Sequence, residues 1–179
     1  ISQTGYNIEQ TTTALIKPNL CGYYHPSNEL LTSIIEHTQP QVEEIILGET
    51  KSGVHNPKNQ FRKLGIKEFE KRYDKVKTLD LSNGERIKIK IPRPKALEEI
   101  EIPKIVDKAN ILINVSKVGT HFATKLTNAS KNLFGLLPHK DKHSRYHPLG
   151  MDKVISDLCQ VIKPDINITD AEERILIGV

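Results

Sequence analysis

Five polar residues in three separate segments have side chains suited to binding a small anion. Lys17 and Asn19 stand on either side of a proline, Lys117 follows an apolar run, and Lys131 and Asn132 precede a glycine-containing segment. An ammonium group supplies positive charge, and an amide orients a carboxylate or phosphate through hydrogen bonds. Three ammonium groups that converge on one pocket would also lower one another's proton affinity, which makes a lysine reactive.

The segment around Lys131 has a second interpretation. A helix that runs toward Gly135 could end at Asn132, and Lys131 would then be a favourable charge at the negative end of the helix dipole. Local propensity does not separate this structural role from anion binding.

Acid–base groups accompany the lysines. Glu49 ends a β-prone run, and Thr120 and His121 follow Lys117. We expect His121 to act as a general acid or base, or Lys117 if nearby charges lower its proton affinity, with Glu49 as its partner. The candidate catalytic residues are Lys17, Glu49, Lys117 and His121, and the candidate substrate-binding residues are Asn19, His25, Thr120, Lys131 and Asn132.

A metal site in this chain would need histidine and carboxylate ligands. Only two cysteines are present, Cys21 and Cys159, and both are expected to be small buried side chains. The chain alone therefore cannot ligate an iron–sulfur cluster through cysteines. The candidate ligands for a divalent metal are Glu49, His121 and Asp170, which no short spacing connects.

Three histidines recur at every fourth residue. On a helix, His139, His143 and His147 would lie on one face and could hold zinc. Pro138 and Pro148 flank this stretch, and it has no apolar face, so a regular helix is not expected. The sequence favours a basic loop, which could close as a lid over an anionic substrate.

The composition is typical of one soluble α/β domain that covers residues 1–179. The 179 residues are 37% hydrophobic and 27% charged. No apolar run approaches the roughly 20 residues of a membrane helix, and no targeting segment is visible, so we expect a cytoplasmic protein. The last residues, 175–179, form no polar tail, which predicts that the native chain continues or contains loops that this sequence lacks.

The formal net charge is +4, and basic residues outnumber acidic ones between Lys104 and Lys153. This asymmetry allows an alternative function, in which the basic region 117–147 binds nucleic acid or a redox partner protein. Only Phe122, Phe134 and Tyr146 could stack on bases there. Nucleic acid is therefore not the expected partner, and a small anionic ligand is.

The first half of the chain predicts a βαβ unit. Residues 13–17 form a β-prone run that stops at Pro18, residues 28–39 carry apolar residues at helical spacing, and residues 42–49 form a second strand. Such a unit requires parallel strands and a right-handed crossover. The runs 76–81 and 86–91 flank Asn83-Gly84, a strong hairpin turn, so we expect them to pair in a small excursion at about 76–92.

The second half predicts a central strand, a helix and a final strand. Residues 110–115 are the most apolar run, residues 151–162 are an amphipathic helix, and residues 165–170 alternate as a strand does. The predicted fold is therefore α/β, three-layer α/β/α with a mostly parallel sheet and a small β-hairpin excursion. Because ligands of such sheets bind at the carboxyl ends of the strands, the candidate residues should gather along that edge.

The order of several motifs resembles the family of domain of unknown function 362 (DUF362). The motifs are Ile16-Lys17-Pro18-Asn19, His25-Pro26, Gly48-Glu49, the segment 113–121, Lys131-Asn132-Leu133-Phe134-Gly135, and Lys163-Pro164 leading to Asp170-Ala171. Many members carry a ferredoxin-like segment with iron–sulfur clusters, which nothing here matches, so the resemblance implies a ferredoxin-like redox partner at most. The chain departs from the family pattern at Ser116, where proline is usual, and at 172–174, where glycines are usual.

Overall fold

The computed structural model describes residues 8–20, 25–121, 124–138 and 142–175. Its centre is a six-stranded sheet with the strand order β3-β2-β1-β6-β7, in which β8 also pairs with β6. The strands are β1 (Thr11–Pro18), β2 (Val42–Glu49), β3 (Val76–Asp80), β6 (Ile111–His121), β7 (Lys125–Thr127) and β8 (Ile166–Ile175). All of these pairings are parallel except that of β7 with β6.

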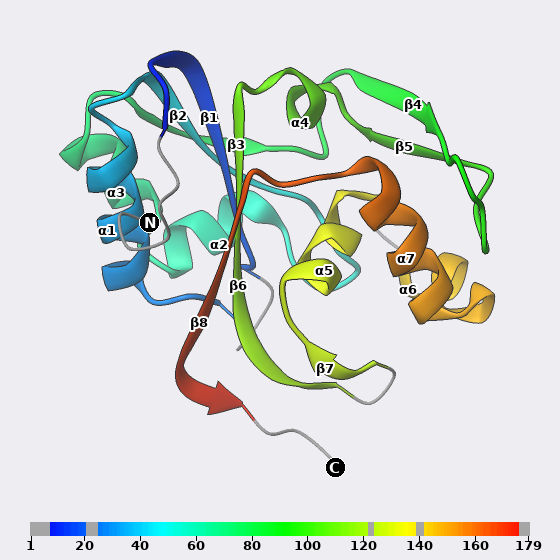
Figure 1. The fold of residues 1–179 in the computed structure, drawn as a ribbon. Helices are drawn as coiled ribbons and strands as arrows, with labels where there is room; N and C mark the ends of the chain where they lie inside the picture. The colour runs from blue at the N-terminus through cyan, green and yellow to red at the C-terminus, as the bar shows by residue number, and fades with distance from the viewer. Residues whose placement is uncertain (1–7, 21–24, 122–123, 139–141, 176–179) are drawn as a thin grey trace.

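Helices cover both faces of the sheet (Figure 1). One face carries α1 (Asn28–Thr38), α2 (Pro57–Lys63) and α3 (Lys67–Arg72). The other carries α4 (Lys104–Lys108), α5 (Ala129–Asn132), α6 (Lys142–Tyr146) and α7 (Met151–Val161), with the short 3-10 helices η2 (Leu133–Leu136) and η3 (His147–Leu149). The expected three-layer α/β/α architecture with a mostly parallel sheet is confirmed.

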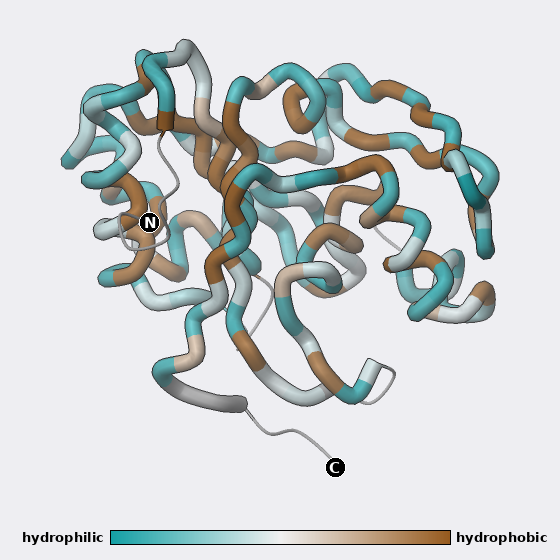
Figure 2. The backbone as a smooth tube through the Cα atoms, in the orientation of Figure 1, coloured by the Kyte–Doolittle hydropathy of each residue, from teal (hydrophilic) through white to brown (hydrophobic). Residues whose placement is uncertain are grey.

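Two hydrophobic cores lie on the two faces of the sheet because side chains alternate along each strand. In β1, Ala14 and Ile16 pack in the core beneath α1–α3, whereas Leu15 packs in the core on the α7 side. Figure 2 shows the apolar residues following the central strands, with hydrophilic residues at the periphery. Lys17 lies two residues after Leu15 in β1, so its side chain points to the same face of the sheet, toward the α5–α7 layer.

The βαβ unit is formed as expected. Ser27 caps α1 by accepting a hydrogen bond from the Leu30 backbone N–H at 3.2 Å, and β1 and β2 pair in parallel. Gly48 in β2 lies against side chains from neighbouring elements, since a Cβ there would come within 2.8 Å of Leu81 and 2.9 Å of Leu15. This close packing fixes the backbone immediately before Glu49.

The small antiparallel excursion is present, but the strand pairing expected across Asn83-Gly84 was wrong. β3 joins the main sheet beside β2, and β4 (Arg86–Lys90) pairs with β5 (Glu99–Pro103). Gly84 does turn the chain with a φ of 107°. The turn residues set the local geometry, whereas burial of Val76 beside β2 decides the partner of β3.

Helix α7 packs its apolar face, including Val154 and Leu158, into the core, and it also buries a carboxylate. Asp157 is fully buried, and its carboxylate accepts hydrogen bonds from the backbone N–H groups of Lys95, Ala96 and Leu97 at 2.8–3.1 Å. The expectation that Cys159 is buried was wrong, because the inward face is centred on Val154 and Leu158 and leaves Cys159 exposed. Cys21 lies outside the described residues.

Among the described residues, no helix has both the length and the apolar character needed to cross a membrane.

Candidate functional site

A cavity of about 530 Å³ lies at the carboxyl ends of β1 and β2. The loop after β2 forms one wall, and α5, η2, α6 and η3 form the opposite wall. The strands reach it because β1 ends at Pro18 and β2 at Glu49, at the same edge of a parallel sheet. It is lined by Lys17, Asn19, Leu20, Glu49, Thr50, Ser52, Gly53, Val54, His55, Pro57, Gln60, Thr127, Lys131, Asn132, Phe134, Gly135, Lys142, His143, His147 and Met151.

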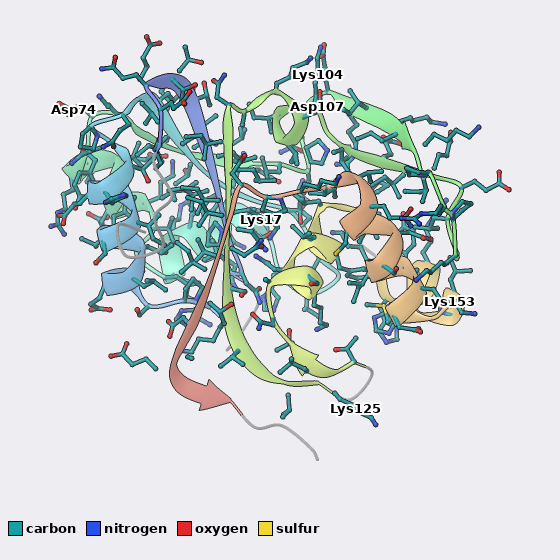
Figure 3. The ribbon with its side chains drawn as sticks, viewed as in Figure 1. Lys17, Asp74, Lys104, Asp107, Lys125 and Lys153 are labelled. Atoms are coloured by element: carbon teal, nitrogen blue, oxygen red, sulfur yellow. The ribbon has the colours of Figure 1, made fainter. Side chains whose placement is uncertain are left out.

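Lys17 is buried at the base of this cavity, with 1% of its surface exposed. Its Nζ donates to Glu49 Oε1 at 3.0 Å, to Asn132 Oδ1 at 3.0 Å and to the Pro18 carbonyl oxygen at 3.3 Å. An ammonium has three protons, so these acceptors fix its position completely. Figure 3 shows Lys17 in the interior, whereas Lys125 and Lys153 lie at the periphery.

The carboxylate of Glu49 is held as firmly as the ammonium. Oε2 accepts from the Leu20 backbone N–H at 3.0 Å, and Oε1 accepts from the Thr50 backbone N–H at 2.7 Å in addition to Lys17. The Thr50 hydroxyl donates to the Gly135 carbonyl oxygen, which attaches η2 to the end of β2. These backbone donors fix the position of the carboxylate beside the ammonium, so the Lys17–Glu49 pair is a preorganised ion pair.

A row of amides supports Lys17 from the neighbouring strands. Lys17, Asn114 and Asn167 occupy matching register positions on β1, β6 and β8. Asn132 Nδ2 donates to Asn114 Oδ1 at 2.8 Å, and Asn114 Nδ2 donates to Asn167 Oδ1 at 2.7 Å. Sequence reasoning missed Asn114 and Asn167, although an asparagine inside the apolar run Ile111–Val115 is a detectable signal.

Helix α5 is only four residues long and depends on polar contacts for its position. Its cap is Asn128, whose Oδ1 accepts from the Ala129 backbone N–H at 2.7 Å, from Ser116 Oγ at 3.0 Å and from Thr169 Oγ1 at 2.6 Å. These bonds attach α5 to β6 and β8. They place Lys131 and Asn132 on the cavity wall, so these two residues line the site as well as forming the end of a helix.

The rest of the cavity wall is rich in cationic and imidazole groups. Lys131 and Lys142 line it, and Lys142 Nζ donates to the Lys51 carbonyl oxygen, which joins α6 to the loop after β2. The rings of His143 and His147 lie 3.9 Å apart. Burial, and then the charges of His143 and Lys131, lower the pKa of His147 below its ordinary value of 6.5. An anion in this cavity would therefore meet a positive potential.

A second buried ion pair lies on the opposite face of the sheet. Lys117 Nζ is 3.3 Å from Asp170 Oδ1, and Asp170 Oδ2 accepts from the Ser27 backbone N–H at 2.8 Å, next to the start of α1. Burial raises the pKa of Asp170, but the backbone N–H groups of Ser27 and Glu172 and the ammonium of Lys117 together lower it below its ordinary value. Lys117 differs from Asn114 by three positions along β6, so the two side chains point to opposite faces.

The structure therefore divides the residues that the sequence grouped along one edge. Those lining the cavity are Lys17, Asn19, Glu49, Lys131 and Asn132, whereas Lys117 and Asp170 form the pair on the other face. Thr120 and His25 are not among the cavity-lining residues; Thr120 pairs with Leu126 between β6 and β7, and His25 Nδ1 lies 3.2 Å from the Pro26 carbonyl oxygen.

The metal ligands suggested by the sequence are separated in the same way. The carboxylates of Glu49 and Asp170 each contact a different lysine, and the side chain of His121 and all of His139 lie outside the described part of the chain. Within that part, no three histidine, cysteine or carboxylate side chains are close enough to hold a metal ion.

Several lining residues had no place in the sequence-based site. Gln60 is buried, and its Nε2 donates to the Leu20 carbonyl oxygen at 2.6 Å and lies 3.3 Å from His55 Nδ1. His55 and Thr50 come from the loop after β2, whose path the local sequence does not specify. Lys142 was overlooked because the segment around it lacks periodicity.

One protein-family model matches nearly all of the elements described above. The family model described as domain of unknown function (DUF362) matches residues 14–173, from within β1 to within β8. No curated protein matches the chain.

Proposed function

The chain belongs to the DUF362 family, and from this premise and the site geometry we propose that it is an enzyme that binds a small anionic substrate, a carboxylate or a phosphate, in the cavity at the ends of β1 and β2. One observation carries the proposal: a buried and fully hydrogen-bonded Lys17–Glu49–Asn132 cluster forms the base of a cavity whose other charged lining is cationic.

The cluster is costly for the fold, which supports a functional role. Burying two charges carries a desolvation penalty of several kcal/mol per ion that the pair barely recovers. A rigid pair beneath a ligand site instead supplies fixed dipoles for charge that develops in a reaction. Because Lys17 and Glu49 neutralise each other, the attraction for an anion comes from Lys131 and Lys142 on the walls.

We assign proton transfer in the cavity to His147. Its lowered pKa leaves the imidazole neutral near pH 7, and a neutral imidazole can accept a proton. This assignment replaces Lys117, which lies on the other face of the sheet. His143 lies beside His147 with the ring centroids 3.9 Å apart, and its charge contributes to the lowered pKa of His147.

The alternative of nucleic-acid binding through residues 117–147 has less support. Phe134 packs edge-to-face against Tyr146 with the ring centroids 5.9 Å apart, and Tyr146 is buried. Lys117 is also buried in its ion pair. These residues are used inside the fold, so they form no exposed stacking platform of the kind that single strands require.

Anion binding by matched lysine variants tests the proposal. Isothermal titration of phosphate and benzoate should show binding by the wild-type chain that Lys131→Ala weakens about tenfold or more, because a charge-assisted hydrogen bond is lost. Lys153→Ala, which removes an exposed lysine from α7, should have no effect. Equal affinity in both variants, or tight binding of a labelled oligonucleotide at low salt with no anion binding, would overturn the proposal.

A further inference from the structure

A second hollow adjoins the cavity on its outer side. It has a volume of about 540 Å³ and lies over β7, α5 and the start of α7. Lys131 and Met151 line both spaces, so these two side chains stand between the inner cavity and the outer hollow. The floor of the outer hollow is apolar where Leu126, Ala129 and Ile155 line it.

The inner cavity is larger than an anionic group requires. One water molecule takes about 30 Å³ of liquid volume, so a carboxylate or phosphate fills on the order of 100 Å³. Much of the remaining wall is apolar and includes Leu20, Pro57 and Phe134. A bare anion would leave this surface in contact with water.

Each of the two spaces is lined by one exposed apolar side chain. Among the described residues, four large apolar side chains are exposed, namely Val54, Leu79, Leu126 and Leu149. Val54 lines the inner cavity and is 83% exposed, and Leu126 lines the outer hollow and is 56% exposed. Exposed apolar surface at a cavity mouth is typical of a ligand-binding groove.

From these shared lining residues and the apolar walls we infer that the substrate is an amphipathic organic acid, whose anionic head lies in the inner cavity and whose apolar body passes Lys131 and Met151 onto the outer hollow. The inference rests on the proposed function, since it names the substrate class of the same site. Lys131 stands at the junction, where its ammonium can contact the head and its methylene stem can pack along the body.

Chain-length dependence tests the inference. Titration of acetate, butanoate, hexanoate and octanoate should show affinity rising at least twofold per added methylene. Complete burial of each methylene group would raise the affinity about fourfold. Leu126→Asp should lower the affinity for octanoate at least tenfold and leave the affinity for acetate unchanged. The matched control is Leu79→Asp, the same change at an exposed leucine on the edge strand β3, which should alter neither acid.

The outcomes separate the two proposals. If no acid binds, the proposed function fails and the inference fails with it. If all acids bind with equal affinity and Lys131→Ala weakens each of them, the proposed function stands and the amphipathic substrate is refuted. A length dependence that Leu126→Asp leaves intact would also overturn the inference, because the apolar body would lie elsewhere.

A second copy of this chain is the competing occupant of the outer hollow. It would give concentration-dependent dimerisation in sedimentation velocity that Leu126→Asp abolishes, together with no dependence on acid length. That result would overturn the inference.

Discussion

Two buried lysine–carboxylate pairs stand at the carboxyl ends of the parallel strands, and they differ in what surrounds them. The Lys17–Glu49 pair borders a cavity of about 530 Å³, whereas the Lys117–Asp170 pair lies against the backbone at the start of α1. Both pairs are buried and both are hydrogen-bonded by backbone N–H groups. A buried ion pair therefore does not by itself identify a site; the open space beside it does.

The largest expected effect comes from breaking each pair in turn. Lys17→Met and Lys117→Met should each lower the free energy of unfolding by about 3–5 kcal/mol, because each leaves an unpaired buried carboxylate. Urea denaturation measures this loss. Only Lys17→Met should also abolish anion binding.

A double variant keeps this prediction testable if Lys17→Met does not fold. Lys17→Met combined with Glu49→Gln removes both charges, so it should recover most of the lost stability. It also removes the hydrogen bond from Lys17 that holds Asn132 at the base of the cavity, so it should still fail to bind the anion although Lys131 and Lys142 remain. Anion binding that survives in the double variant, or that is lost in Lys117→Met, would erase the distinction between the two pairs.

A smaller effect is expected from the row of amides that supports Lys17 on the cavity side of the sheet. Asn114 is buried and bonds Asn132, Asn167 and the Ala129 carbonyl oxygen. Asn114→Ala should cost about 2–3 kcal/mol in urea denaturation, because it leaves buried partners unsatisfied. Amide hydrogen exchange should then accelerate in α5, whereas the exposed Asn59→Ala on α2 should change neither measurement. Unaltered exchange in α5 would show that this row does not position Lys131.

The smallest expected effect is on stability at acid pH and comes from the Lys117–Asp170 pair. The folded-state pKa of Asp170 is below the ordinary value of 3.8, so its contribution to stability is present above that value and is lost as the pH falls through the folded-state pKa. In Asp170→Asn, the free energy of unfolding should fall less steeply between about pH 5 and pH 2 than in the wild type.

The control is Asp152→Asn, at an exposed position of α7. Its free energy of unfolding should fall with decreasing pH as steeply as that of the wild type. Identical slopes for Asp170→Asn and the wild type would mean that the Lys117–Asp170 pair does not contribute to acid stability.

Most of the fold could be predicted because its signals are local. Pro18 ends β1, Ser27 caps α1, and the apolar runs of β1, β2 and β6 mark parallel strands. The parallel βαβ rule then places Lys17 beside Glu49 without any coordinates. The pairing of β3 could not be predicted in this way, because Asn83-Gly84 specifies a turn and not the long-range partner of the strands beside it.

The division of the site could not be predicted because the length of β6 was misjudged. An expected end at residue 115 allows Lys117 to bend toward the cavity, but β6 continues to His121, and its regular pairing with β8 runs through Lys117. Asn114 therefore faces Asn132, and Lys117 faces Asp170. One strand thus sends Asn114 and Lys117 to opposite layers.

The sequence by itself determined the chemical groups, the two strands that end beside each other, and the family of the chain. Only the tertiary structure decided which groups share a cavity, because that depends on strand parity and on the short helices α5 and α6, which are positioned by contacts with distant residues such as Ser116 and Lys51. Such contacts are set by the packing of the whole chain, and no local pattern of residue types encodes them.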